Sequence, residues 1–233
     1  NTNSTLGSSN FDGSIQATVK VNATAGFSIV SYTGTGSALT VGHGLGVAPD
    51  VLIVKNREEA SSWRVFHHKN TSAPETEYLA LDNTNATFDR NDWNDTLPIS
   101  TVFSVGPQGA VNNNNIDYIG YIFSEVAGYS KFGSVNTNGS TDNAFIYLGF
   151  RAKFIMFKRS DGSGNWTMWD TSRNTFNVMD KYLFANSSGS EGTDSQFDIL
   201  SNGIKLRTSG YVNGGTYIYF AFAEAPFKNA RAR

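Results

Sequence analysis

Hydrophobic and polar residues alternate in short runs along most of the chain. Six runs in the first half are rich in Val, Ile, Phe and Tyr, and clusters of Gly, Asn, Asp and Ser separate them; they span residues 26–33, 50–55, 63–69, 78–82, 101–105 and 117–125. Such alternation is typical of β-strands. Helical periodicity is missing, although residues 171–184 could hold one helical turn. The pattern predicts an all-β protein made of antiparallel sandwich or jelly-roll-like units, because a parallel α/β fold needs intervening helices.

The order of these runs repeats once along the chain. Five blocks keep their order at offsets between 99 and 104 residues, and the matching residues include Gly26 and Gly128, Lys55 and Lys158, Trp63 and Trp166, Tyr78 and Tyr182, and Tyr118 and Tyr217. The sequence therefore predicts two tandem homologous β-sandwich units, residues 26–127 and residues 128–233, the second ending in a C-terminal tail. We expect the matched Trp63 and Trp166 in the cores.

The first 25 residues differ from the repeat. Residues 1–25 are mostly small and polar, with a weak alternation at Ile15, Ala17, Val19 and Val21. This composition predicts either a linker or an edge strand that leads in from an upstream segment.

Composition excludes several kinds of chemistry. The chain of 233 residues has no cysteine, which excludes a disulfide scaffold, a thiol nucleophile, an iron–sulfur cluster and a cysteine-bound zinc ion. The net charge of −2 gives no electrostatic footprint for nucleic acid or for an anionic membrane. Apolar runs all stay well below the roughly 20 residues of a membrane-spanning helix. We therefore expect no nucleic-acid partner and no membrane insertion.

The residue types that carry catalysis do not form a known motif. His43 lies in a glycine-rich turn without the spacing of a dinucleotide fingerprint, and His67 and His68 are neighbours in a strand, so their side chains point to opposite faces. A GxSxG nucleophile elbow does not occur. Glu125 and Glu224 recur at equivalent strand ends, which favours a structural role for both. We expect a non-enzymatic protein without a metal site.

The acidic, Asn-rich segment 89–95 contains the first candidate binding residue, Trp93. An indole ring in such a loop offers a face on which a sugar can stack, and the alternative is a ring that folds back over the sandwich edge. The four asparagines at 112–115 predict a hairpin tip, so Asn113 and Asn114 join Trp93 as candidate carbohydrate-binding residues. Segment 89–95 lacks the glycine and glutamate of an EF-hand loop. Calcium is thus possible but not supported, and we expect no cofactor.

Several blocks of the sequence resemble a known family. They are GFSIVSYTGTGS (26–37), VGHGLGVAPDVLIVKN (41–56), SEVAGYSKFGS (124–134), DKYLFANSS (180–188), GIKLRTSG (203–210) and TYIYFAFAEAPFKNARAR (216–233). These blocks are similar to a domain of unknown function in tail-fibre and other virion structural proteins of marine tailed bacteriophages. The resemblance covers residues 13–233, and its ending is similar to the natural C-terminus of such proteins, which places partner sequence upstream of Asn1. It implies a particle component and carries no catalytic residues.

The low charge content, 16% of residues, suits this implied setting. In seawater the Debye length falls to ~3–4 Å, so hydrogen bonds and stacking serve adhesion better than charge. We expect a structural component of a phage virion, of tail-fibre or appendage type, at the extracellular virion surface. Its expected partners are further copies of itself (a trimer in a fibre), other virion proteins and host-surface carbohydrate. The alternatives are a capsid decoration protein, a secreted bacterial adhesin or carbohydrate-binding module, and a glycan depolymerase with converging carboxylates.

Overall fold

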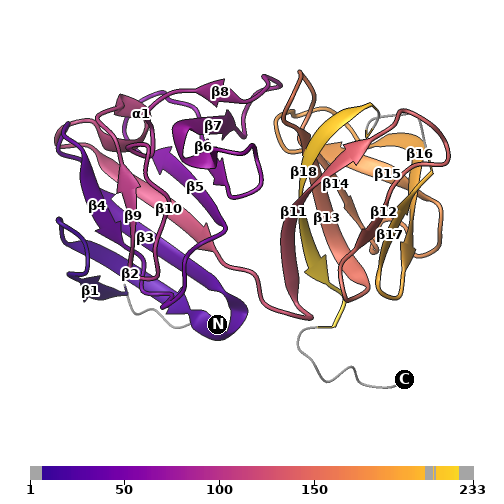
Figure 1. Ribbon diagram of the computed structural model, residues 1–233, viewed down its shortest axis with the longest axis horizontal. Helices are drawn as coiled ribbons and strands as arrows, with labels where there is room; N and C mark the ends of the chain where they lie inside the picture. Colours follow the sequence, from indigo (N-terminus) through magenta and orange to yellow (C-terminus); the bar gives the residue numbers. More distant parts are fainter. Residues whose placement is uncertain (1–6, 208–211, 213, 226–233) are drawn as a thin grey trace. The chain divides into compact units, whose positions relative to one another are not determined.

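The computed structural model describes residues 7–207, 212 and 214–225 (Figure 1). Two compact units divide the chain: the first holds residues 1–68, 72–80 and 88–124, and the second holds residues 69–71, 81–87 and 125–233. Both consist of antiparallel strands, so the predicted all-β sandwich class is confirmed. The main division falls after Ser124 instead of after residue 127. Residues 208–210 and 226–233, which end two of the blocks that carry the resemblance, lie outside the described residues.

The first unit contains an eight-stranded sheet and a two-stranded sheet. The larger sheet has the spatial order β1-β2-β3-β10-β5-β6-β7-β8, and β4 pairs with β9. The bounds are β1 (Ser8–Asn10), β2 (Ala17–Asn22), β3 (Phe27–Thr33), β4 (Leu39–Gly42), β5 (Val51–Asn56), β6 (Arg64–His67), β7 (Glu77–Ala80), β8 (Phe88–Asp89), β9 (Val102–Val105) and β10 (Asp117–Phe123).

Strand β10 lies at the centre of the larger sheet, with β3 on one side and β5 on the other. Its residues alternate as a strand with one core face requires: Tyr118 and Ile122 are fully buried, whereas Ile119 and Tyr121 are half-buried. The buried face packs into a core that also contains Val54 and Phe103.

The second unit is a single eight-stranded sheet that folds back on itself as a sandwich. Its order is β11-β18-β13-β14-β15-β16-β17-β12, so β11 and β12 are its two edges. The bounds are β11 (Ser130–Thr137), β12 (Phe145–Tyr147), β13 (Ala152–Arg159), β14 (Thr167–Asp170), β15 (Met179–Phe184), β16 (Gly192–Leu200), β17 (Gly203–Leu206) and β18 (Gly215–Ala223). The core lies between its two halves and is rich in aromatic rings, among them Phe157, Trp169 and Phe197.

The two units share a common arrangement of strands. The order β3-β10-β5-β6-β7 in the first unit matches β11-β18-β13-β14-β15 in the second, and the pair β4–β9 matches β12–β17. The pairing register also repeats: Tyr118 lies opposite Asn56, and their counterparts Tyr217 and Arg159 lie opposite each other. The internal similarity of the sequence therefore corresponds to a repeated topology.

One strand departs from the sequence alignment by a single residue. Val30 lies opposite Gly120 in the first unit, and in the second unit Gly133 lies opposite Tyr219. Val30 therefore corresponds to Gly133, whereas an offset of 102 would match it with Phe132. The large and small partners are exchanged between the units, and a Cβ atom on Gly133 would lie only 2.4 Å from the Tyr219 hydroxyl oxygen. Because Tyr219 is buried, the pKa of its hydroxyl rises to about 12.

Helical structure is short among the described residues. It comprises α1 (Gly109–Asn112) and the 3-10 turns η1 (Ala23–Ala25) and η2 (Pro74–Thr76). Residues 171–184, where one helical turn was predicted, form turns followed by β15 instead. No helix in the described residues has the length and apolar character needed to cross a membrane.

The N-terminal segment forms a β-hairpin of the first unit. Strand β1 pairs with β2, and β2 pairs along its length with β3. Before β2, Ile15 forms a parallel bridge with Val41 of β4, and the Ser14 N–H donates to the Thr40 hydroxyl oxygen at 2.8 Å. Residues 8–22 therefore occupy the seam between β3 and β4, where Ala17 and Val19 complete the core.

The two matched tryptophans differ in their environment. Trp166 is fully buried, as predicted. Trp63 is only half-buried and stacks on Tyr121, with ring centroids 6.2 Å apart and planes inclined by 22°. The prediction that both tryptophans are core residues is therefore wrong for Trp63, which lies on the face of the sheet opposite the first unit's core.

His43 is a buried structural residue that connects two loops. Its side chain has no solvent exposure; Nδ1 accepts the Leu45 N–H at 3.2 Å, and Nε2 lies 3.0 Å from the Ile99 carbonyl oxygen. The first contact requires an unprotonated Nδ1, so the ring is neutral and Nε2 donates. Burial lowers the pKa of His43, against smaller opposing effects of the Ile99 carbonyl and Asp12.

We expect His43 to make the chain less stable in acid. Because its pKa is lower in the folded than in the unfolded chain, the stabilisation from the neutral ring is complete above pH ~6.5 and is lost as the pH falls below that value. Between pH 7.5 and pH 5, the free energy of unfolding should fall more steeply for the wild type than for His43→Gln, by up to about 1.4 kcal/mol per pH unit. Urea unfolding at both pH values measures the difference, and parallel pH profiles would contradict the assignment.

Candidate functional site

Trp93 is a core residue of the first unit, so its prediction as a sugar-stacking platform is wrong. Only 1% of the residue is exposed, the ring meets Phe66 edge-on at 6.0 Å between centroids, and Nε1–H donates to the Glu77 carbonyl oxygen at 2.9 Å. The segment turns inward because indole burial and this hydrogen bond outweigh the polarity of its neighbours. No face of the ring is available to a ligand.

The residue before Trp93 holds this segment in place by ion pairs. Asp92 is fully buried; its carboxylate lies 2.7 Å from Arg90 Nε and 3.2 Å from Arg64 Nε. Both guanidinium groups also lie over the Tyr78 ring, at 3.9 Å for Arg64 and 4.9 Å for Arg90. Burial raises the pKa of Asp92, and the two arginines oppose that rise. The cluster is structural, since its charges are directed at one another.

Asn113 and Asn114 follow α1, in the turn that leads into β10. Asn113 Nδ2 donates to the Glu59 carboxylate at 3.1 Å, and its backbone N–H donates to the Tyr118 hydroxyl at 2.6 Å. Asn114 is exposed, and its N–H is bonded to Asn113 Oδ1. The preceding Asn112 is buried and donates to the Ser37 and Gly106 carbonyl oxygens. The asparagine run thus ends a short helix instead of forming a hairpin tip, and no described contact joins it to Trp93.

The buried carboxylate of the acidic segment 89–95 is engaged in ion pairs. Asp92 is paired with two arginines, and the described part of the chain contains no group of three His, Asp or Glu side chains arranged to hold a metal ion.

The second unit carries an exposed apolar strip on the outer face of strands β16, β17 and β12. Phe145 is 46% exposed, Tyr147 60% and Leu200 37%. Tyr147 lies opposite Gly203, which in turn lies opposite Leu200. Phe145 leans over the same glycine, because a Cβ atom there would lie 2.9 Å from its ring. We call Phe145, Tyr147 and Leu200 the aromatic strip; Ile146, which points the other way, is a core residue.

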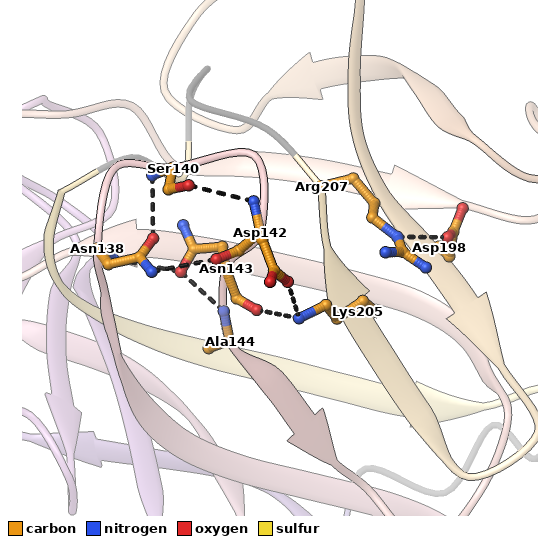
Figure 2. A network of polar contacts seen from close by, with 8 residues as sticks. All are labelled: Asn138, Ser140, Asp142, Asn143, Ala144, Asp198, Lys205 and Arg207. Carbon is orange, nitrogen blue, oxygen red and sulfur yellow. Dashed lines mark hydrogen bonds and ion pairs between the residues drawn. The ribbon is translucent and has the colours of Figure 1, made fainter.

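Charged groups lie beside Phe145, and Figure 2 shows the polar network that they form. Lys205, opposite Phe145, reaches Asp142 at 2.8 Å and also donates to the Asn143 carbonyl oxygen. On the neighbouring strand Asp198 pairs with Arg207 at 2.8 Å. The hydrogen bond from Lys205 lowers the pKa of the exposed Asp142.

A cleft of about 810 Å³ lies at the other end of β12. Its wall includes Tyr147, Lys131, Arg151 and the two recurring glutamates, Glu125 and Glu224. Lys131 Nζ lies 5.6 Å from the centre of the Tyr147 ring. Glu125 accepts the Phe132 N–H at 2.9 Å, and Glu224 pairs with Arg151 at 2.8 Å. Both carboxylates therefore have structural partners in the cleft wall.

We expect Trp93→Ala to destabilise the protein. Removing a buried indole leaves a cavity and an unpaired carbonyl group, which together lower the free energy of unfolding by about 3–5 kcal/mol. The exposed Asn114→Ala serves as the control and should change it by less than about 0.5 kcal/mol. Denaturant unfolding measures both; a Trp93→Ala effect as small as that of the control would refute the buried position.

Comparisons with known proteins give a family but no function. No curated protein matches the chain. One solved structure, described as the crystal structure of the STIV MCP, matches at 11% identity and a TM-score of 0.20, over 82% of this chain and 84% of that one. A TM-score this low carries no argument about fold or role. A family model matches residues 2–226. The chain therefore belongs to the family described as Domain of unknown function (DUF7483).

Proposed function

We propose that this protein is a non-enzymatic structural component of a phage virion, of tail-fibre or appendage type, that binds host-surface carbohydrate through the aromatic strip. The observation that carries the binding proposal is the exposure of Phe145 and Tyr147 on one sheet face of the second unit, bordered by charged groups. The virion role is supported by the sequence blocks that resemble phage structural proteins.

The chemistry of the strip suits a saccharide. Aromatic rings stack on the C–H faces of sugars without a deep pocket, and Gly203, between Tyr147 and Leu200, leaves room for the Phe145 ring to lie flat against the sheet. Lys205 and Asp198 lie opposite each other beside Phe145, so the ion pairs Lys205–Asp142 and Arg207–Asp198 give the strip a polar border. A few polar groups around an apolar contact are the usual composition of a small-molecule site.

The environment of the glutamates supports binding over hydrolysis. A glycosidase needs one carboxyl group free to give a proton and a second free to act on the sugar or on water. Glu125 accepts the Phe132 N–H and Glu224 pairs with Arg151, so both carboxylates already have partners in the cleft wall.

The binding proposal is tested by removing the two rings. Phe145→Ala/Tyr147→Ala should weaken binding to an array of bacterial surface glycans by about 5- to 150-fold, since each of the two lost stacking contacts is worth roughly 0.5–1.5 kcal/mol. Phe176→Ala is the matched control because that ring is 83% exposed and lies outside the strip. Equal binding by the double variant and the control would reject the strip as the site.

A further inference from the structure

The two units treat the same sheet edge differently. In the first unit β3 pairs with β10 on one side and with β2 on the other. In the second unit β11 pairs with β18, and the described residues provide no strand on its other side. Unpaired strand edges are templates for further strands, so this difference bears on association.

Hydrogen bonds at the strand ends show which backbone groups point outward. In an antiparallel pair, hydrogen-bonded residues recur every second position. The Ser124 N–H donates to the Gly26 carbonyl, so Gly26 and every second residue after it bond toward β10. The backbone N–H and C=O groups of Phe27, Ile29 and Ser31 therefore face β2.

The equivalent hydrogen bond shows which backbone groups of β11 point away from β18 in the second unit. There the Ala223 N–H donates to the Tyr129 carbonyl, so the groups of Ser130, Phe132, Ser134 and Asn136 face away from β18.

Half of this outward edge is already capped. The Ser130 N–H donates to the Val126 carbonyl and the Phe132 N–H donates to the Glu125 carboxylate, both at 2.9 Å. Within the described residues no acceptor meets the N–H of Ser134 or of Asn136, and both residues are exposed. The open stretch of the edge is therefore centred on Ser134.

Strand β12, at the other end of the sheet order, also has a side on which the described residues place no strand. The Leu206 N–H donates to the Ala144 carbonyl and the Leu148 N–H to the Asn202 carbonyl, so even-numbered residues bond toward β17. The backbone groups of Phe145 and Tyr147 point the other way. In the first unit the corresponding seam between β3 and β4 holds residues 8–22.

We propose that the open edge of β11 docks an extended strand from another polypeptide, with small or β-branched residues alternating with polar ones. This chemistry follows from β2 (residues 17–22), which pairs with β3, the strand that corresponds to β11. Ala17 and Val19 of β2 face the core, whereas Thr18 and Lys20 face outward. The bonds are main-chain hydrogen bonds, as in other strand additions. The proposal is independent of carbohydrate binding, because it uses backbone groups of β11.

A synthetic peptide with the sequence of residues 8–22 is a suitable probe, added at 1 mM to the full chain. Hydrogen exchange measured by mass spectrometry should slow at Ser134–Asn136 by at least tenfold when the peptide is present. Ser134→Pro removes the outward N–H at a place where an edge strand tolerates proline, and it should abolish this protection. Ser134→Ala keeps the N–H and should retain it.

The thermal transition of each variant checks that the second unit stays folded. Protection that disappears in Ser134→Pro and persists in Ser134→Ala supports the docking edge. Unchanged exchange in the wild type, or equal protection in both variants, overturns it. The Phe145→Ala/Tyr147→Ala variant should still bind the peptide, so failure of the carbohydrate proposal would be seen separately.

Discussion

The backbone groups at the edge of a β-sheet must find partners, and this requirement shapes both units. A strand with one unpaired side exposes a row of N–H and C=O groups to water and to other chains. The first unit meets the requirement at β3 with its own residues 8–22, which pair with β3 and reach β4, so that β1 becomes the edge of the sheet. The second unit caps part of β11 with Glu125 and leaves the stretch around Ser134 open among its described residues.

The repeat explains why the comparison between the units is informative. In the first unit the central strand β10 lies between β3 and β5, and in the second unit β18 lies between β11 and β13. Where Val30 lies opposite Gly120, Gly133 lies opposite Tyr219, so volume lost on one strand is gained on its neighbour. The two cores are thus filled in different ways while the topology is retained. The edges at β3 and β11 differ because the β1–β2 hairpin precedes the first unit and pairs with β3.

Sequence reasoning was reliable for the features that depend on local pattern and internal similarity. Alternation indicated the all-β class, and Tyr118 and Tyr217, matched in the sequence, lie at equivalent positions of the strand pairing. It failed for Trp93, because that ring is buried by Phe66 from a distant strand and not by its polar neighbours. The aromatic strip was missed since AFIYLGF is apolar on both faces, and alternation alone does not tell whether Ile146 or Phe145 and Tyr147 face the core.

Amide hydrogen exchange of the isolated chain tests the edge difference most directly. Ser31 on β3 corresponds to Ser134 on β11, and each has its backbone N–H directed away from the central strand. The account predicts that the N–H of Ser31, covered by Thr18 of β2, exchanges at least a hundredfold more slowly than the N–H of Ser134. Equal protection at the two positions would contradict an open edge in the second unit.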